Sequence, residues 1–510
     1  MTLRVYNTLS KQKELFETTK PGEVGIYLCG PTVYKPPHIG HMVGPIIFDA
    51  IKRYLAYKGF KVTWVVNITD VDDKLIKEAV EQKSTMAEVA ERCTAQYLDA
   101  LNALGIDGID VFPKASEHIP EIIAMCQTLV EKGHAYPAGG NLWFDVSSDP
   151  DYGKLSHRSA DEQESGTRDL EGAGKRDKAD FALWKAAKKG EPTWDSPWGP
   201  GRPGWHIECS AMSMRYLGKT FDIHGGGMDL LFPHHENELA QSESATAAPF
   251  ARFWMHNNLT KMKTKLASGE VKSEKMSKSL GNVVGAREAI DDLGPDLLRY
   301  LVLSTHYRSP IDFSEEVVVA NRKALGTLQR LFERVERLTG KSVREKQPDL
   351  DSAANDLLDG GYSDFAREGL ALKMKFLEMM DDDFNTAGAI AVLHELTSLI
   401  NGFIERGGLE KSKPAPASPS TAASAASAAT QTLRNLGLIL GLFRVARAAP
   451  GGRAGKSDDL PDKLMSLIIR LRADARAAKN FPLSDAIRKG LADIGITVED
   501  RPDGTIWRRN

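Results

Sequence analysis

The fold is decided by the stretch Val24–His41, whose sequence is VGIYLCGPTVYKPPHIGH. Its first residues, Val24–Leu28, form a short apolar run that predicts a buried strand. A loop rich in glycine and proline follows, and from Ile39 apolar residues recur at three- and four-residue spacing, which predicts a helix. Elements in this order point the free N–H groups of a helix start out of the loop, where they can bind an anion.

Two histidines flank a glycine at the start of the predicted helix. His38 and His41 can donate hydrogen bonds to phosphate oxygens, and Gly40 lets a ligand approach the backbone closely. Cys29 stands at the end of the strand, facing the same crevice. These residues predict a polyphosphate site with a thiol beside it. Because two surface histidines in a loop give the same short string, a second, distant motif is needed.

That second motif is a pair of lysines in the stretch Glu274–Asn282, EKMSKSLGN. Lys275 and Lys278 are three residues apart, with small hydroxyl residues around them, which suits a flexible loop that binds phosphates with point charges. A lone pair of lysines at this spacing is common on protein surfaces. Together with the two histidines it is specific.

Scattered residues also suggest a metal site. A set suited to tetrahedral Zn²⁺ consists of two thiolates, an imidazole and a carboxylate, from Cys29, Cys209, His234 and Glu238. No local pair of cysteines exists, so three separate segments would have to assemble it. His224 and His235 are competing ligands, and His234 with Glu238, four residues apart on a helix, also fits a surface ion pair.

The run Lys61–Ile68 is rich in β-branched residues and predicts a central parallel strand. Polar residues follow at its carboxyl end, which is the edge where open α/β sheets bind ligands. Thr69, at the strand tip, is therefore expected to contact substrate. At least one aspartate within Asp70–Asp73 is expected to cap the predicted helix Lys74–Ala90 instead.

Bulk properties exclude several classes of protein. The chain has 510 residues, of which 42% are hydrophobic, so it can bury several cores. A net charge of −3 gives no global basic field, and 4 cysteines are too few for a disulfide framework. We see no signal peptide and no apolar run long enough to span a membrane. These features predict a soluble, cytoplasmic protein.

At the two motifs the sequence resembles the class I aminoacyl-tRNA synthetases, whose signatures are H-I-G-H and K-M-S-K-S. Three further stretches resemble the cysteinyl-tRNA synthetases closely, namely Cys29–Tyr34, Trp205–Met212 and Phe232–Glu238. The resemblance implies ATP-dependent ligation of L-cysteine to tRNA(Cys) through a cysteinyl-adenylate. It also implies Zn²⁺ as cofactor, Mg²⁺ bound with ATP, and a monomer.

The resemblance assigns roles to individual residues. The zinc ligands would be Cys29, Cys209, His234 and Glu238, with the ion binding the thiolate of the substrate. The cysteine pocket would be lined by Thr69, Trp205, His224 and Asp229. Contacts to ATP and the transition state would come from His38, Gly40, His41, Gly227, Lys275 and Lys278.

The resemblance also implies an α/β fold with a Rossmann-like parallel-sheet catalytic domain, an inserted subdomain, an α-helical bundle and a small α+β C-terminal domain. The boundaries that we predict are 1–130 and 201–260 for the catalytic domain, 131–200 for the insertion, 261–315 for the lysine-loop region, 316–455 for the bundle and 456–510 for the anticodon-binding domain. Within the bundle, an Ala/Ser/Pro-rich stretch at about 408–430 predicts a flexible insertion. In the tail, stacking and charge suited to unpaired tRNA bases are offered by Trp507, Arg508 and Arg509, although an edge strand with a basic end is an equal alternative.

The sequence departs from the family pattern in a few places. Many members have an aspartate where Lys35 stands and an arginine where Val43 stands, and the stretch Asn258–Ser273 is longer than usual and predicts a β-hairpin. One rival interpretation is a related ligase that joins activated cysteine to an amino sugar. Another is a tRNA-binding relative without catalytic activity, against which the intact histidines and lysines argue.

Overall fold

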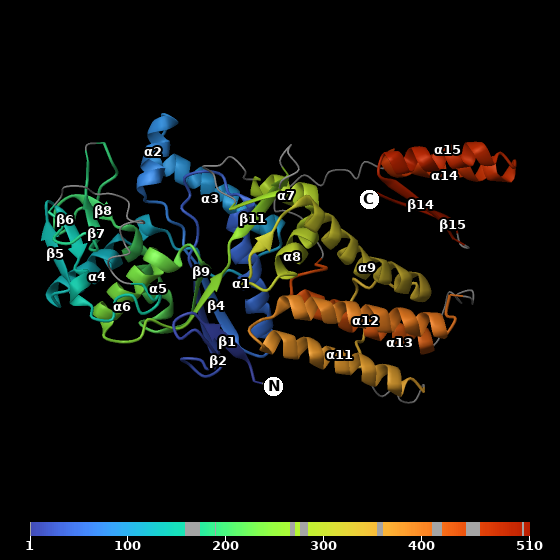
Figure 1. Cartoon of the computed structure of the whole chain (residues 1–510), viewed down its shortest axis with the longest axis horizontal. Coiled ribbons are helices and arrows are strands. Elements are labelled where there is room, and N and C mark those ends of the chain that lie inside the picture. Colours follow the sequence, from blue (N-terminus) through green and yellow to red (C-terminus); the bar gives the residue numbers. More distant parts are fainter. Residues whose placement is uncertain are drawn as a thin grey trace. The chain divides into compact units, whose positions relative to one another are not determined.

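A parallel four-stranded sheet lies at the centre of the larger part of the chain (Figure 1). Its strands are ordered β10 (Ala251–Asn257), β9 (Phe221–Gly227), β3 (Glu23–Leu28) and β4 (Lys61–Val66), and every neighbouring pair is parallel. The carboxyl ends of parallel strands meet at one edge of a sheet. The predicted parallel α/β layout is therefore confirmed.

The computed structural model describes residues 2–158, 174–188, 190–265, 271–275, 284–353, 361–410, 421–444, 460–501 and 504–509. The chain forms two units, Met1–Val445 and Ala446–Asn510. The larger unit holds the sheet, an insertion and a helical bundle. The boundaries that we predicted inside it stay predictions.

Side chains alternate between the two faces of β3, which separates two cores. Ile26 and Leu28 join the core on the side of helix α1 (Ile39–Tyr57), whereas Tyr27 between them joins the core on the opposite side. The second core includes residues of α5 (Trp205–Leu217) and α6 (Glu236–Thr246). The sheet is thus covered on both faces, and α1 begins where the sequence predicts.

The predicted central position of Lys61–Ile68 is wrong, because β4 is the outer strand of the described sheet. An irregular segment runs along its free side, where the Val66 amide donates to the Val111 carbonyl (3.0 Å) and the Ile68 amide to the Pro113 carbonyl (2.8 Å). Trp64 has no exposed surface. An outer strand covered in this way has the same apolar sequence as a central one.

The single helix predicted for Lys74–Ala90 is divided into α2 (Asp73–Glu81) and α3 (Met86–Ala103). Thr85 begins the second helix with a capping box to Glu88. The Asp72 carboxylate accepts a hydrogen bond from the Lys74 amide at the start of α2. The expectation that an aspartate caps a helix here is confirmed.

The insertion forms an antiparallel sheet of β5 (Ala135–Ala138), β6 (Asn141–Phe144), β7 (Phe181–Ala186) and β8 (Gly201–Pro203). β5 and β6 form a hairpin within the predicted insertion. The sheet packs with α4 (Ile119–Glu131) around its own core. Residues 159–173 of the insertion lie outside the described residues.

An ion-pair cluster joins the insertion to α2. The Asp73 carboxylate contacts Lys185 Nζ (2.7 Å) and the Arg202 guanidinium, and both cations are buried. Burial by itself would raise the pKa of Asp73, but Lys185 and Arg202 outweigh it and lower this pKa to about 2. The cluster therefore stabilises the folded state while Asp73 is ionised.

We expect Asp73→Asn to lower stability by about 1 kcal/mol at pH 7, a value reduced for the partial exposure of Asp73. Because the pKa is lower in the folded state, the stabilisation is complete above about pH 4 and disappears as the pH falls towards 2. Thermal unfolding of both proteins at pH 7 and pH 3 measures the difference. Asp382→Asn, which breaks an exposed pair with Lys13, is the control and should change little. An undiminished difference at pH 3 would contradict the assignment.

The helical bundle consists of α9 (Glu315–Thr339), α11 (Ser363–Asp381), α12 (Thr386–Arg406) and α13 (Thr421–Ile439), preceded by α7 (Ala286–Leu293) and α8 (Pro295–Leu303). The flexible insertion predicted at about 408–430 is wrong for residues 421–430, which lie in α13. Alanine has the highest helix propensity, and the buried Ala425, Ala426 and Ala429 let α13 pack closely. Residues 411–420 lie outside the described part.

Among the described residues, α12 is the one helix with the length and apolar composition of a membrane span. It packs between α11 and α13, and Leu393, Leu396 and Ile400 are buried in the core of the bundle. Its apolar composition therefore fits a helix at the centre of a bundle.

An acidic turn, Asp381–Asp383, connects α11 to α12 and contacts the part of the chain that contains the parallel sheet. Asp381 accepts a hydrogen bond from the Tyr54 hydroxyl on α1 (2.6 Å). Asp383 accepts from the Tyr6 amide (2.8 Å), the Tyr307 hydroxyl (2.7 Å) and Arg308 Nε (2.8 Å). One short turn thus contacts three segments that are far apart in sequence.

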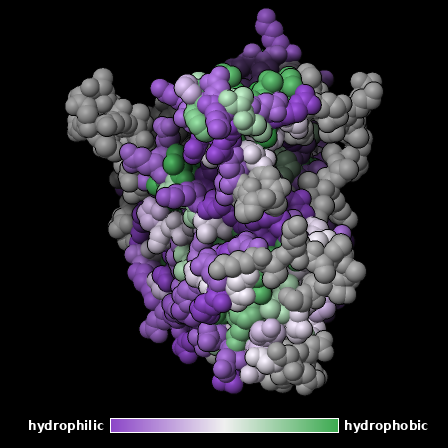
Figure 2. Space-filling view, turned by 90° about the vertical axis from the view of Figure 1, so that its right-hand side faces the viewer, coloured by the Kyte–Doolittle hydropathy of each residue, from purple (hydrophilic) through white to green (hydrophobic). Residues whose placement is uncertain are grey.

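The smaller unit contains α14 (Leu460–Ala477), α15 (Phe481–Asp493) and the hairpin of β14 (Ile496–Arg501) and β15 (Gly504–Arg509). Its core includes Met465, Leu491 and Val498, with Trp507 packed against them. The predicted small α+β domain is confirmed. In α14, the exposed apolar residues include Leu464, Leu467 and Leu471. The surface in Figure 2 is mostly hydrophilic, with separate apolar patches.

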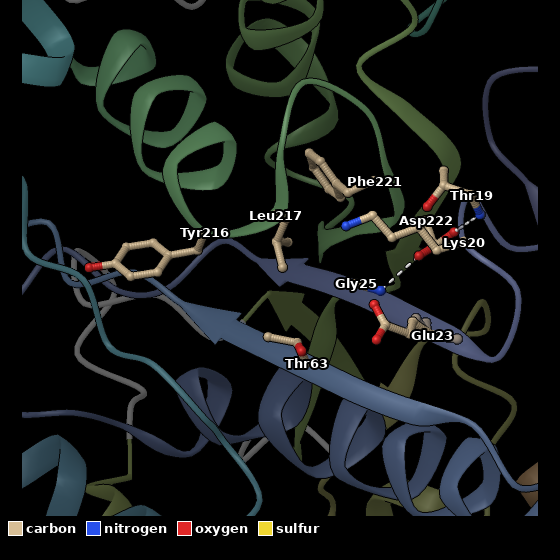
Figure 3. A pocket seen from close by; sticks show the side chains of 10 residues that line it. Thr19, Lys20, Glu23, Gly25, Thr63, Tyr216, Leu217, Phe221 and Asp222 are labelled. Atoms are coloured by element: carbon tan, nitrogen blue, oxygen red, sulfur yellow. Dashed lines mark hydrogen bonds between the residues drawn. The ribbon is translucent and has the colours of Figure 1, made fainter.

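A small polar pocket lies at the amino ends of the strands (Figure 3). The Asp222 carboxylate beside it accepts hydrogen bonds from the backbone amides of Thr19 (2.6 Å) and Gly25 (2.7 Å). These bonds fix the chain as it enters β3. The carboxyl edge of the sheet, where the candidate site residues lie, is the opposite end.

Candidate metal centre and nucleotide site

Three segments bring four candidate ligands together. Cys29 follows β3, Cys209 lies on α5, His234 lies in the helical turn Leu231–His235, and Glu238 lies on α6. Cys29 Sγ is 3.9 Å from Cys209 Sγ and 3.5 Å from Glu238 Oε1. His234 Nε2 is 3.6 Å from Cys209 Sγ and 2.9 Å from Glu238 Oε1. The structure thus places the predicted quartet within one small volume.

These distances fit a tetrahedral zinc ion. Bonds of about 2.3 Å to sulfur and about 2.0–2.1 Å to nitrogen place two thiolates about 3.8 Å apart, and a thiolate about 3.5 Å from an imidazole nitrogen. All four ligand atoms lie within 4.8 Å of one another. The residues present therefore fit the metal that the family resemblance implies.

The charges of the quartet favour a cation. Burial would raise the pKa of Cys209, but hydrogen bonds with Cys29 and His234 bring it down to about 6. Burial and the neighbouring Cys209 raise the pKa of Cys29 well above its usual value. Despite burial, His234 and His224 hold the pKa of Glu238 well below the ordinary range. Despite its burial, Glu238 and Cys209 raise the pKa of His234 to about 9. Acidic ligands that share protons in this way can instead share a divalent ion, whose charge compensates theirs.

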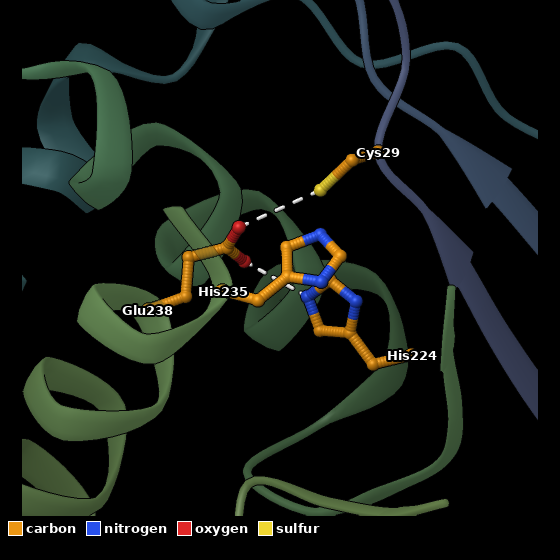
Figure 4. A group of neighbouring side chains, drawn as sticks. All are labelled: Cys29, His224, His235 and Glu238. Atoms are coloured by element: carbon orange, nitrogen blue, oxygen red, sulfur yellow. Dashed lines mark hydrogen bonds and ion pairs between the residues drawn. The ribbon is translucent and has the colours of Figure 1, made fainter. Parts of the chain in front are cut away.

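A second possible ligand set shares two of these residues, as Figure 4 shows. It combines Cys29 and Glu238 with His224 and His235. His224 Nε2 is bonded to Glu238 Oε2 (2.8 Å), which holds the carboxylate with Oε1 towards Cys29 and His234. The set that includes Cys209 has a second thiolate, the softer ligand that zinc prefers over a second nitrogen.

The predicted cysteine-pocket residues lie at different depths. The Trp205 ring stacks on His234, with ring centres 4.1 Å apart. Thr69, at the end of β4, is buried and its Oγ1 accepts from Asn67 Nδ2 (3.2 Å). His224 is fully buried beside Glu238, whereas Asp229 is exposed beyond β9. Trp205 and His224 therefore contact the candidate ligands His234 and Glu238, respectively.

Sequence reasoning missed Glu208, which lies beside Cys209. Its side chain is fully buried, and within the described part of the chain neither carboxylate oxygen makes a hydrogen bond of ordinary geometry, although the Thr69 side chain faces it. Burial raises its pKa well above the usual value, and the acidic neighbours Cys209, Asp72 and Asp70 raise it further. The sequence signal that could have pointed to Glu208 is its position three residues after Trp205, which places both residues on the same face of the helix.

The two histidines of the first motif cap α1 reciprocally. His38 Nδ1 accepts a hydrogen bond from the Gly40 amide (3.1 Å), and His41 Nδ1 accepts from the His38 amide (3.2 Å). The rings stack with their centres 3.8 Å apart. Since each Nδ1 accepts, the hydrogen of each neutral ring belongs on Nε2, which makes Nε2 a donor. A Cβ on residue 40 would lie 2.9 Å from the His38 ring, so glycine is needed there.

The lysine motif follows a hairpin. β11 (Thr260–Lys265) pairs antiparallel with β12 (Val271–Lys275), which confirms the hairpin predicted over 258–273 and places the Lys275 backbone at its end. Lys278 lies outside the described residues. Beyond the motif, the Val284 carbonyl accepts from the Ile39 amide (3.1 Å). The chain thus returns from the lysine motif to the start of α1.

The remaining predicted positions are also located. Gly227, an expected ATP contact, is the last residue of β9, at the carboxyl edge of the sheet. Lys35 pairs with Glu78 on α2 (3.3 Å), so part of its charge is compensated. Val43 is buried in the core under α1.

Comparison with known proteins identifies the family. Residues 15–323, more than half of the chain, match the family described as tRNA synthetases class I (C) catalytic domain. The chain belongs to the cysteinyl-tRNA synthetase family. Two further families match beyond the catalytic part: the DALR domain over residues 375–444, and the Cysteinyl-tRNA ligase anticodon binding domain over residues 457–508.

Relatives agree with this membership. The chain is 44% identical to the Cysteine--tRNA ligase of Heliobacterium modesticaldum and 43% identical to that of Syntrophobacter fumaroxidans, with 100% of each chain covered. Among solved structures, a methionyl-tRNA synthetase of Mycobacterium tuberculosis bound by methionyl-adenylate has a TM-score of 0.59 at 15% identity, covering 82% of this chain and 91% of that one. The latter likeness concerns the fold alone. Family, α/β fold and cysteine--tRNA ligase activity are thus as predicted.

Proposed function

We propose that this family member selects L-cysteine with a bound zinc ion, activates it with ATP as cysteinyl-adenylate, and transfers it to tRNA(Cys). The observation that carries the proposal is the convergence of two thiols, an imidazole and a carboxylate at the carboxyl edge of the sheet. The capped start of α1 follows β3, the strand that precedes Cys29. A metal that selects thiols and a site for phosphate would then lie at the same edge of the sheet.

In this proposal Cys29, Cys209, His234 and Glu238 hold Zn²⁺. When bound, the ion would supply a soft Lewis acid that takes the substrate thiolate and rejects the hydroxyl of serine. Trp205 packs on the His234 ring and holds its plane. His224 fixes the Glu238 carboxylate through its Nε2. Thr69 and Asp229 would contact the rest of the amino acid.

ATP would lie against the start of α1. The Nε2–H groups of His38 and His41 donate to phosphate oxygens, and Gly40 and Gly227 allow close approach to the backbone. Lys275 and Lys278 add positive charge as the transition state forms, and Mg²⁺ accompanies the nucleotide as a counter-charge. These roles follow from the chemistry of the groups and from the family resemblance.

The reaction needs no nucleophile from the protein. A carboxylate oxygen of cysteine attacks the α-phosphorus of ATP in line, and an O–P bond forms. The bond between the α-phosphorus and the oxygen of the leaving pyrophosphate breaks. A ribose hydroxyl of the tRNA end then attacks the acyl carbon, and AMP leaves with the bonding electrons. The side chains position the reactants and stabilise the developing charge.

For the tRNA we propose that the smaller unit binds the anticodon, a proposal supported by its match to an anticodon-binding family. Trp507 packs partly into the small core, so one part of its ring stabilises the hairpin. Arg508 and Arg509 would add charge near the RNA backbone. We also propose a cytoplasmic protein, because none of its four cysteines forms a disulfide and the thiol ligands need a reducing compartment. A monomer stays a prediction.

Two assays test the proposed function. We expect cysteine-dependent exchange of pyrophosphate into ATP, with cysteine preferred over serine by at least about 10⁴-fold. We also expect tRNA(Cys) to be charged. Charging of an amino sugar and not of tRNA would instead support the amino-sugar ligase. A folded, zinc-loaded sample without exchange activity would support the non-catalytic tRNA-binding relative.

A further inference from the structure

A buried amide joins the two helices that carry Cys209 and Glu238, two of the four candidate metal ligands. Gln241 lies on α6, three residues after Glu238, and its side chain is fully buried. Its Nε2 donates to the His206 carbonyl (2.7 Å) and to Ser210 Oγ (2.7 Å), both on α5. One side chain therefore makes two hydrogen bonds across the contact between α5 and α6.

Both partners of Gln241 lie next to ligand residues. His206 Nδ1 is 2.9 Å from His234 Nδ1, the ring nitrogen that faces away from the other ligands. Ser210 directly follows Cys209, and its Oγ is 3.4 Å from the Glu238 carbonyl. Through these contacts Gln241 is linked to ligands on both sides of the site.

We propose that Gln241 is a positioning residue for the metal site, which holds α5 and α6 at the spacing that brings Cys209 to His234 and Glu238. The proposal deepens the proposed function and rests on its zinc site. A metal site tolerates errors of only about 0.2 Å in its ligand distances. The seam between the helices is built from small polar side chains. Loss of the amide removes one donor from the His206 carbonyl and one from Ser210 Oγ, to which Ser242 Oγ still donates (2.8 Å), and this lets the helices shift.

The test compares Gln241→Met with Gln431→Met in the full-length protein. Gln431 is a matched control, because it is also buried on a helix, donates from Nε2 to Asn435 (3.0 Å) and has an Oε1 without a partner, but it lies in the bundle. Metal-free samples are titrated with Co²⁺, whose visible spectrum reports tetrahedral thiolate coordination, and Zn²⁺ affinity is measured by competition. The KM for cysteine, the KM for ATP and kcat in pyrophosphate exchange complete the comparison.

We expect Gln241→Met to weaken Co²⁺ and Zn²⁺ binding by about 10-fold to 100-fold. The KM for cysteine should rise by at least about 10-fold, because cysteine is the substrate that meets the metal. The KM for ATP should stay within about twofold. Gln431→Met should lower the Tm similarly and leave metal affinity unchanged.

Ser210→Ala removes one of the two hydrogen bonds and keeps the proposal testable if Gln241→Met does not fold. It should weaken metal binding by a smaller factor, and the double variant should lose less than the sum of the two effects. Wild-type metal affinity and an unchanged KM for cysteine in both variants would overturn the positioning role. Absence of metal binding by the wild-type protein would instead contradict the proposed zinc site itself.

Discussion

The Cys209→Ser variant should lose its zinc ion under conditions where the wild-type protein retains one ion per chain. Serine keeps the volume of the side chain but is not deprotonated at neutral pH, so the soft thiolate is lost. The loss of zinc affinity should exceed the 10-fold to 100-fold loss that is typical when a residue hydrogen-bonded to a metal ligand is replaced. The KM for cysteine in pyrophosphate exchange should rise with it, and metal analysis after dialysis provides the direct measurement.

Cys126→Ser is the matched control, because Cys126 is equally buried but lies in the core of the insertion, where burial raises its pKa above the usual range. This variant should keep its zinc and its KM for cysteine even if its Tm falls. Unchanged zinc content in the Cys209 variant would show that the ligand set is wrong. The alternative set, which uses His224 and His235, would then be the one to test.

The second large effect concerns His38. His38→Ala should lower kcat for adenylate formation by about 10²-fold to 10³-fold, the usual cost of removing one donor to a developing oxyanion. It also removes the cap of α1, because His38 Nδ1 accepts from the Gly40 amide, and that loss should cost about 0.5–2 kcal/mol of stability. Pre-steady-state pyrophosphate release and thermal unfolding measure the two effects separately.

His38→Asn separates the cap from the chemistry. Asparagine is among the best helix caps, so its side chain should restore most of the stability, but it lacks the Nε2–H donor. We therefore expect a Tm close to wild type with kcat still reduced at least about 10²-fold. Recovery of kcat together with Tm would mean that His38 acts only as a helix cap.

Strong periodicity made several elements predictable from sequence. The strand before Cys29, the helix from Ile39 and the hairpin before Lys275 all occur where expected. The position of β4 was mispredicted because apolar sequence reports burial and not the place of a strand in a sheet. The helical residues 421–430 were misread because Ala/Ser-rich sequence was taken as a linker, although alanine favours helix.

The site residues also include some that the sequence predicted and some that it did not. The chemistry of the side chains suggested the ligand set, but only the family resemblance chose it over the competing histidines, because no local spacing links residues as distant as Cys29 and Glu238. Gln241 and Glu208 were not predicted, since their importance lies in contacts between helices that leave no pattern in the sequence. The role of a buried polar side chain on a helix can be recognised only when the neighbouring helix is known.

The acidic turn between α11 and α12 has a consequence for dissecting the molecule. Asp381 and Asp383 satisfy hydroxyl and amide groups of Tyr6, Tyr54 and Tyr307, which all belong to the catalytic half. Cutting the chain upstream of this turn removes their acceptors and exposes the underlying surface of α1 to water. Sheet and bundle should consequently melt together in calorimetry, as one cooperative block that cannot be expressed as two independent pieces.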